Sequence, residues 1–163
     1  MLNWSLIKSI LEPLTDIAVI ITAIFVFMQV RKASEQIRSA ESMKKVDRAL
    51  DYSMRWNDPA YVEWRSYAYR FLTDKNKSHA AKEEELKSDL TIRLKVYNTL
   101  NILEEMALAC RSGGIDETVC QGFFKTTVVE FYRAARGLIE DIQKRDGVGI
   151  FKELLWLGER WSK

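Results

Sequence analysis

Apolar and polar positions alternate at helical spacing along most of the chain. One apolar stripe recurs at steps of three or four residues, with no helix breaker before Asn57, and so predicts a single long helix; it comprises Val30, Ala33, Ile37, Ala40, Met43, Val46, Leu50 and Met54. Asp58 followed by Pro59 is typical of a helix start. The pattern beyond it predicts helices over 59–73, 82–111, about 115–124, about 125–144 and 150–161. We therefore expect an all-α protein.

The predicted helix from Lys82 to Arg111 is apolar on two sides, which is typical of the central helix of a bundle. Gly113 and Gly114 follow it and predict a carboxyl-terminal cap. Gly147 and Gly149 predict the break before the last helix. The carboxyl-terminal two thirds of the chain should thus fold as a helical bundle.

The residues from Ile17 to Val30 carry no charge and are apolar on every face of a helix. At 14 residues, the run covers only about 21 Å, so a full membrane span needs it to extend back towards Leu11. We interpret it as a single membrane span or anchor; a buried core helix and a signal peptide are the alternatives. Arg31 and Lys32 follow at once, and by the positive-inside rule they place the carboxyl side in the cytoplasm and the short amino end outside.

This interpretation divides the chain into three parts. Residues 1–32 form a membrane anchor, in which a short interfacial helix over 3–11 enters the membrane at Pro13. Residues 33–56 form a helical stalk, and residues 57–163 form the cytoplasmic bundle. The apolar stripe of the stalk packs on the protein's own helices or pairs with a second copy in a parallel coiled coil.

Composition narrows the chemistry of the chain. The 163 residues include 25 Lys and Arg against 23 Asp and Glu, so the net charge of +2 excludes a broadly basic coat, and nucleic acid is an unlikely partner. Cys110 and Cys120 are expected to be reduced thiols, although a disulfide between them is conceivable. With these two cysteines and one histidine, His79, the chain lacks the ligands of a structural zinc site. It also lacks a glycine-rich phosphate loop, so we expect no cofactor, no metal and no enzymatic activity.

Two groups of cationic and aromatic residues are candidates for contact with a partner or with anionic lipid. The first lies on the stalk and comprises Lys44, Lys45 and Arg48; the second lies on the helix over 59–73 and comprises Arg65, Tyr69 and Arg70. A solvated helix face is the alternative for both groups.

Polar residues also follow the predicted central helix at helical spacing. Buried polar groups must be paired, so we expect one buried network that consists of Asn98, Asn101, Glu104, Glu105, Arg133 and Arg136. A catalytic or metal site built from Glu104, Glu105 and Asp116 is disfavoured, because nothing nearby in the sequence supplies a nucleophile or a histidine.

Several of these segments together resemble an uncharacterised family of small bacterial proteins. The resemblance rests on Trp56–Pro59, Leu100–Leu108, Ser112–Asp116, Phe131–Tyr132, Phe151–Leu154 and Trp161. It implies one amino-terminal membrane helix and a cytoplasmic helical domain. Such proteins also resemble components of phage-defence neighbourhoods.

The sequence thus predicts a membrane-anchored helical interaction or signalling module at the bacterial inner membrane, acting as an accessory or effector of phage defence. Its partners would be the membrane and either another protein or further copies bound through the stalk. One alternative is an oligomeric effector that disrupts the membrane. The other is a soluble helical enzyme or nucleic-acid binder in which residues 14–30 belong to the core.

Overall fold

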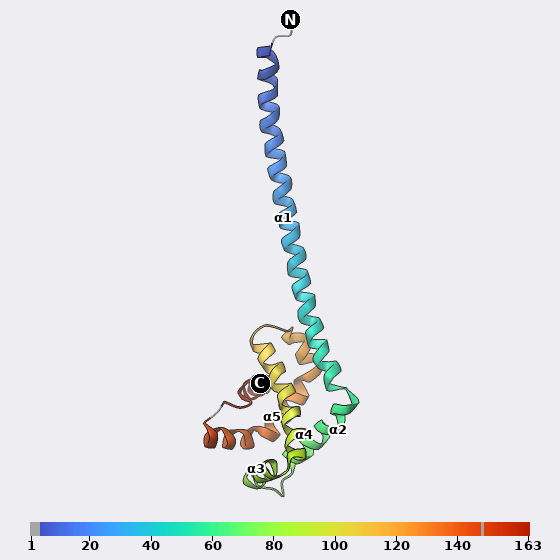
Figure 1. Ribbon diagram of the computed structural model, residues 1–163, viewed down its shortest axis with the longest axis vertical. Coiled ribbons are helices and arrows are strands. Elements are labelled where there is room, and N and C mark those ends of the chain that lie inside the picture. The colour runs from blue at the N-terminus through green and yellow to red at the C-terminus, as the bar shows by residue number, and fades with distance from the viewer. Residues whose placement is uncertain (1–3, 148) are drawn as a thin grey trace. The chain divides into compact units, whose positions relative to one another are not determined.

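The computed structural model describes the backbone of residues 4–147 and 149–163 and the side chains of residues 18–147 and 149–163. The described backbone contains six helices and no strand, which confirms the all-α prediction (Figure 1). The helices are α1 (Trp4–Trp56), α2 (Pro59–Thr73), α3 (His79–Ser88), α4 (Leu90–Arg111), α5 (Glu117–Asp146) and α6 (Lys152–Trp161). The chain divides into two compact units, Met1–Met43 and Lys44–Lys163.

Helix α1 accounts for all of the described backbone in the first unit. It runs through Pro13 without ending there, so the separate interfacial helix predicted over 3–11 is wrong. A proline removes one backbone hydrogen bond from a helix, and the good helix formers around it, such as Leu11 and Leu14, continue the helix. The predicted end of the helix before Asn57 is confirmed, and the Asn57 side-chain amide there donates to the Ser53 carbonyl at 2.9 Å.

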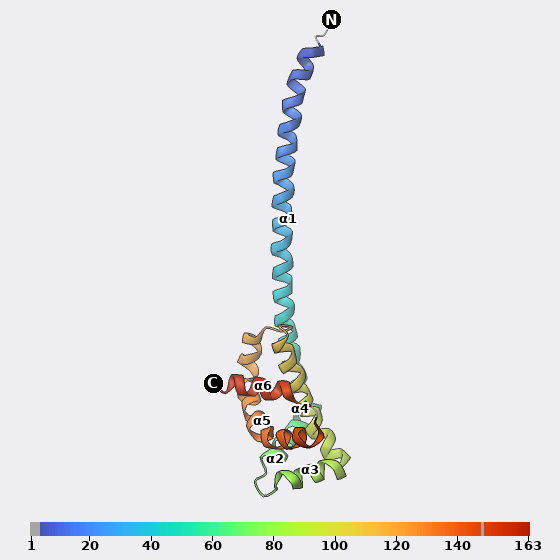
Figure 2. The ribbon, with the colours of Figure 1, turned by 90° about the vertical axis from the view of Figure 1, so that its left-hand side faces the viewer.

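In the second unit, α4 and α5 are the helices around which the bundle is built (Figure 2). Helix α4 packs against α2, α3 and α6, and α5 packs against the same three helices. The core between them is apolar and tightly closed; its fully buried members include Val96, Leu100, Leu103, Met106, Phe124, Val128, Ile139, Leu154 and Leu157. The central position predicted for the helix that contains Leu103 is therefore confirmed.

The end of α1 packs on this core through a face that differs from the predicted stripe. Ala49 and Trp56 are buried, whereas Leu50 and Met54, two members of that stripe, are exposed. The Trp56 ring meets the rings of Phe124 and Phe131 edge to face, at centroid distances of 6.0 and 5.8 Å. These aromatic contacts fix which face of α1 points inward.

The single helix predicted over 82–111 is wrong, because Asp89 divides it into α3 and α4. Asp89 has an extended backbone, with ψ near 107°, and its carboxylate accepts hydrogen bonds from the Thr91 and Ile92 amides at 2.8 and 3.1 Å. It thereby caps the amino terminus of α4. The leucine pattern continues across this break, but Leu90 and Leu94 are exposed.

The prediction of two separate helices over 115–144 is also wrong, because the single helix α5 takes their place. Its amino terminus is capped by the Asp116 carboxylate, which accepts from the Val119 amide at 3.0 Å. Its end at Gly147, with φ of 64°, was predicted. The helix is continuous between them because the intervening sequence contains no proline and only Gly122 and Gly137 as weak breakers.

Two glycines allow helices of the second unit to approach closely. A Cβ atom at Gly158 would lie 2.4 Å from Cβ and Cγ of Tyr132, so α6 needs a glycine where it meets α5. A Cβ atom at Gly137 would lie 2.1 Å from Cε1 of His79. His79 begins α3, and its ring contacts α5 although about half of the side chain stays exposed.

Candidate functional site

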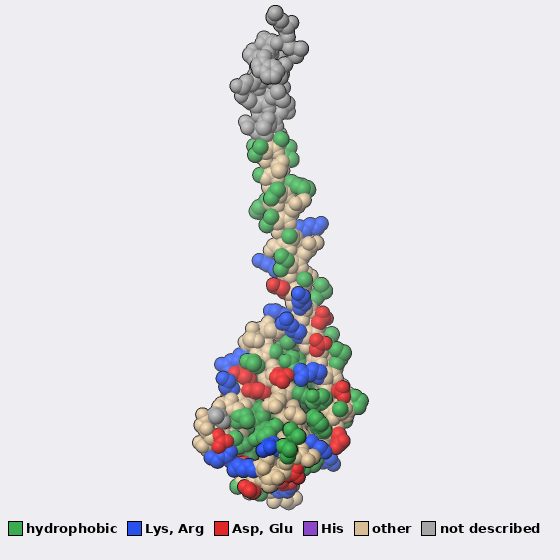
Figure 3. All heavy atoms as spheres, in the orientation of Figure 1, with side chains coloured by type: hydrophobic (Ala, Val, Ile, Leu, Met, Phe, Trp, Pro, Cys, Tyr) green, Lys and Arg blue, Asp and Glu red, His purple; other side chains and the backbone are tan. Residues whose placement is uncertain are grey.

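The first candidate site is the apolar segment of α1, which we define as residues 17–30. From Val19 to Val30, every large apolar side chain is between 51% and 68% exposed. These side chains point in most directions around the helix, because the helix turns by about 100° per residue. Figure 3 shows the apolar side chains along the visible face of this segment. This surface is one that water solvates poorly.

The described side chains, those of residues 18–147 and 149–163, include no helix long and apolar enough to cross a membrane. The membrane helix predicted from the sequence is thus unsupported as a complete span, because Arg31 and Lys32 end the charge-free run early. Its extension back through Leu11 lies outside the residues whose side chains are described.

The cations of the stalk have different roles. Lys44 and Lys45 are exposed, as a contact surface requires. Arg48 instead donates from Nη1 to the Gly114 carbonyl at 3.1 Å, and the nearby Asp116 amide donates to the Lys45 carbonyl at 3.2 Å. Arg48 thus fastens the turn between α4 and α5 to α1.

The cations of α2 also differ from the exposed patch that we predicted. Arg65 is half-buried, and its Nη1 donates to the Trp56 carbonyl at 2.5 Å, while its guanidinium lies 5.3 Å from the Trp56 ring centroid. A cation at the carboxyl end of a helix stabilises its unpaired carbonyl groups. Tyr69 packs on Phe131, and Arg70 donates to the Ser66 carbonyl of its own helix at 3.3 Å. Both stay exposed enough to meet a partner.

Glu104 does not belong to the predicted buried network. Its carboxylate is half-buried and accepts the backbone amides of Glu153 and Leu154 at 3.2 and 2.6 Å. These amides begin α6, whose own cap residue, Phe151, has a left-handed backbone and makes no side-chain cap. Glu104 of α4 therefore caps α6 from across the bundle.

The remaining members of that network also lie apart. The exposed Glu105 pairs with Arg55 at 3.3 Å, and Arg136 pairs with Glu140 at 2.6 Å. Arg133 and Asn101 are exposed, and Asn98 is half-buried. Both arginines are exposed on α5, whereas the Glu104 carboxylate accepts the amides that begin α6. No group of three possible metal ligands occurs among the residues that the structure describes.

A second candidate site, which we did not predict, is a pocket of about 580 Å³ between α2, α3 and α5; we call it the basic pocket. It is lined by Tyr69, Leu72, Thr73, Asp74, Lys75, Lys77, His79, Lys82, Glu130, Arg133 and Ala134. Lys75, Lys77 and Lys82 lie close together in the sequence, but Arg133 follows 51 residues after Lys82, so no local pattern reveals the pocket. Its nearest sequence signal is Lys82, a lysine on the face that α3 shares with Leu86.

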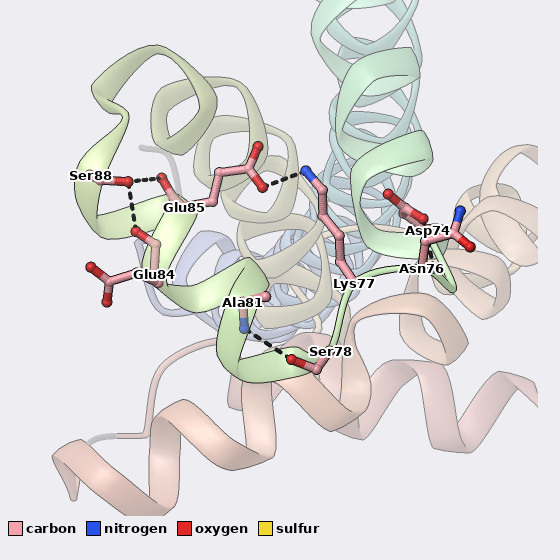
Figure 4. Close-up of polar contacts among 8 residues, drawn as sticks. All are labelled: Asp74, Asn76, Lys77, Ser78, Ala81, Glu84, Glu85 and Ser88. Carbon is pink, nitrogen blue, oxygen red and sulfur yellow. Dashed lines mark hydrogen bonds and ion pairs between the residues drawn. The ribbon is translucent and has the colours of Figure 1, made fainter.

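The loop before α3 and the first turn of α3 position these cations. Figure 4 shows Lys77 pointing towards Glu85, with 2.5 Å between ammonium and carboxylate, and Ser78 capping α3 at the Ala81 amide. His79 Nδ1 lies 3.0 Å from a carboxylate oxygen of Asp141. Lys82 is only 5% exposed and donates from Nζ to the Leu72 carbonyl at 2.6 Å. Burial lowers the pKa of the Lys82 ammonium below its ordinary value, and the neighbouring Asp74 carboxylate opposes this shift.

One known protein family matches nearly the whole length of the chain. A family described as Domain of unknown function (DUF4760) matches residues 14–161. The chain belongs to this family. The match covers both the whole apolar segment and the helical bundle, so DUF4760 describes the two together. No curated protein and no solved structure matches the chain.

Proposed function

We propose that the chain is a membrane-anchored interaction module of the bacterial inner membrane. In this proposal, the apolar segment lies in lipid and holds residues 44–163 at the cytoplasmic face. Exposed cations such as Lys44 and Lys45 then meet anionic lipid or a protein partner. The observation that carries the proposal is the exposure of large apolar side chains on most sides of α1 between Val19 and Val30.

The size of this exposed surface supports lipid as its cover. Full burial of one large apolar side chain contributes about 1.5–3 kcal/mol. Nine large apolar residues of the segment are each about half exposed: Val19, Ile20, Ile21, Ile24, Phe25, Val26, Phe27, Met28 and Val30. Covering them is therefore worth on the order of 10 kcal/mol, which equals the total stability of an ordinary domain. A partner that covers one face would leave the others in water, whereas lipid covers all of them.

The charges next to the segment support its orientation. Arg31 and Lys32 come directly after the apolar run, where their long side chains reach the headgroups while their stems stay in the apolar layer. Basic residues are retained on the cytoplasmic side of a membrane segment. The amino end is accordingly outside, and the carboxyl-terminal bundle is cytoplasmic.

A second copy of the chain is the partner best suited to the helix beyond the basic pair. A seam at alternating four- and three-residue steps runs through Val19, Ala23, Val26, Val30, Ala33, Ile37 and Ala40, and all of these residues are exposed. Arg31, Lys32, Glu35 and Arg38 all lie off this seam. Ile37 follows the charges that end the lipid segment, so lipid does not cover it. Two parallel copies inserted in the same orientation would cover it with each other's seam.

Alkaline carbonate extraction of membranes tests the anchor. We expect the full chain to stay in the pellet and a variant with Ile21→Asp and Phe25→Asp to leave it, because two charges in lipid each cost several kcal/mol. Ile37→Asp is the matched control, since it changes an equally exposed apolar residue of α1 beyond the basic pair, and it should stay in the pellet. Release of the unmodified chain by carbonate would refute the anchor.

Oxidative cross-linking tests the seam separately. Cysteine at Ile37 or Ala40 should give a disulfide-linked dimer, whereas cysteine at Glu35, on the opposite side of the helix, should not. The natural Cys110 and Cys120 are buried, so the unmodified chain serves as the background. Equal cross-linking at all three positions would refute the seam and leave the anchor standing.

A further inference from the structure

The basic pocket lies entirely within residues 69–134, so a ligand bound there does not require the membrane anchor. Its lining contains four permanent cations, Lys75, Lys77, Lys82 and Arg133, against the carboxylates of Asp74 and Glu130. Lys77 pairs with Glu85, which lies outside the lining, so the remaining three cations and two carboxylates leave a net charge of +1. A pocket of this charge favours an anionic occupant.

Three of the four cations lack an ion-pair partner in the described part of the chain. Lys77 is satisfied by Glu85. By contrast, the side chains of residues 18–147 and 149–163 place no carboxylate within ion-pair distance of Lys75, Lys82 or Arg133. The pocket therefore gathers three cations that make no direct ion pair with a described residue.

Lys82 is the most informative of these cations. Its ammonium is buried, and the partner that the structure gives it is the uncharged Leu72 carbonyl. An ammonium has three donors, so two remain for a ligand. The Asp74 carboxylate favours the ammonium but makes no ion pair with it, and the cost of burial outweighs its effect. Such a cost is typical of residues that bind a charged ligand. A lysine kept only for packing would be replaced at lower cost by methionine or leucine.

We propose that the basic pocket binds a phosphate monoester, with Lys82 as its buried cation and Lys75 and Arg133 as its outer ones. A phosphate monoester is close to a dianion at neutral pH and so supplies the negative charge that Lys75, Lys82 and Arg133 lack. Lysine and arginine are the side chains that bind phosphate oxygens most strongly. The volume of about 580 Å³ also lies within the range of small-molecule sites.

The two carboxylates of the lining, Asp74 and Glu130, limit where the phosphate of the ester can lie. The carboxylate of Asp74 accepts the Asn76 amide at 2.9 Å and so is held near the loop backbone. Glu130 lies one helical turn from Arg133 and Ala134 on α5, and would repel a phosphate placed beside it. The phosphate oxygens therefore lie towards Lys82, between the outer cations Lys75 and Arg133, rather than beside Glu130. The ring of Tyr69 is left for the organic part of the ligand.

The phosphate ester can come from solution or from the headgroup of a phospholipid, and titration calorimetry distinguishes these sources. The full chain in dodecyl maltoside micelles is titrated with adenosine monophosphate and with dihexanoyl phosphatidate, each beside its control, adenosine and dihexanoyl phosphatidylcholine. Binding of both phosphates shows that the monoester suffices, and binding of phosphatidate alone assigns the site to a lipid headgroup. Binding of neither at about 5 mM, or equal binding of adenosine, would overturn the proposal.

Variants then place the ligand in the pocket. Lys82→Met keeps the shape of the side chain and should weaken binding by about tenfold or more. Arg133 is exposed, so Arg133→Gln should leave the fold intact and weaken binding by about threefold to tenfold. Lys144→Met is the matched control, because Lys144 is an exposed lysine of α5 outside the pocket lining, and it should bind like the parent. If both Lys82→Met and Arg133→Gln bind like the parent, the pocket is not the site.

Discussion

Replacing Glu104 by alanine tests whether one carboxylate of α4 holds α6 in place. The substitution removes the acceptor of the Glu153 and Leu154 amides, and α6 has no side-chain cap of its own. Loss of a helix cap costs about 0.5–2 kcal/mol, and hydrogen bonds to charged groups lie at or above the upper end of that range. We therefore expect Glu104→Ala to lower the free energy of unfolding by about 2 kcal/mol.

A circular-dichroism melt of the full chain in micelles measures this loss. About 2 kcal/mol corresponds to a fall in Tm of about 8 °C for a domain of this size. Glu105→Ala is the matched control, because Glu105 is exposed and pairs only with Arg55, and such a pair contributes about 0–1 kcal/mol. If Glu104→Ala melts like the parent, or like Glu105→Ala, the cap does not hold α6.

Glu104→Gln adds a pH dependence whose sign the structure determines. Burial raises the pKa of the Glu104 carboxyl above its ordinary value of 4.5, and the Leu154 and Glu153 amides oppose that rise. The folded protein therefore binds the Glu104 proton more tightly than the unfolded chain does. The stability gained in this way is fully present below the pKa of Glu104 in the unfolded chain and is lost as the pH rises through its pKa in the folded protein. Glutamine does not titrate, so the deficit of Glu104→Gln relative to the parent should be larger at about pH 4 than at about pH 7. The opposite order would show that the carboxylate form is the favoured one.

Three further predictions concern the packing of the bundle. Gly158→Ala should destabilise the protein by about 1–3 kcal/mol, because the new Cβ would clash with Tyr132. A Cβ at Gly122 meets nothing within 4 Å, so Gly122→Ala should stabilise the protein by about 0.5–1 kcal/mol. Urea unfolding measures both changes. Cys110 and Cys120 should react with a thiol reagent only after unfolding, because both side chains are buried. The hydrogen bond with Cys120 also raises the pKa of the Cys110 thiol, which makes that thiol less reactive. Rapid labelling of the native protein would contradict this prediction. Arg65→Gln should lower the free energy of unfolding by about 1 kcal/mol through loss of its bond to the Trp56 carbonyl, and an unchanged melt would contradict that role.

Local signals predicted most of the fold. The Asp58–Pro59 pair and the Gly113–Gly114 and Gly147 ends act within one turn of the helix that they bound, so a single sequence reveals them. Asp89 was missed although it is an equally good cap, because the leucines on either side of it continue the helical spacing. A periodic pattern does not show a break when the residues after the break keep the same phase.

The candidate sites were less predictable because they depend on contacts distant in the sequence. Glu104 caps a helix whose first amides lie 49 and 50 residues further along, and Arg65 pairs with a carbonyl of the preceding helix. The basic pocket joins Lys75 and Lys82 to Arg133 across three helices. The apolar segment, by contrast, was evident from the sequence, since the absence of charge over 17–30 needs no partner to be seen.

The most direct test of the membrane anchor is the collision accessibility of nitroxide labels in lipid bilayers. Single labels at Ile20, Phe25, Val26 and Met28 point to four different sides of α1. In lipid, the labels at Ile20, Phe25 and Met28 should collide readily with oxygen and poorly with a water-soluble nickel complex, while a label at Glu35 should show the reverse. The label at Val26 lies in the proposed seam and should be inaccessible to nickel whether lipid or a second copy covers it. Nickel accessibility at some of the four positions and protection from both reagents at the others would mean that a protein partner covers one face. That result would contradict the account of residues 17–30 as a lipid-embedded anchor.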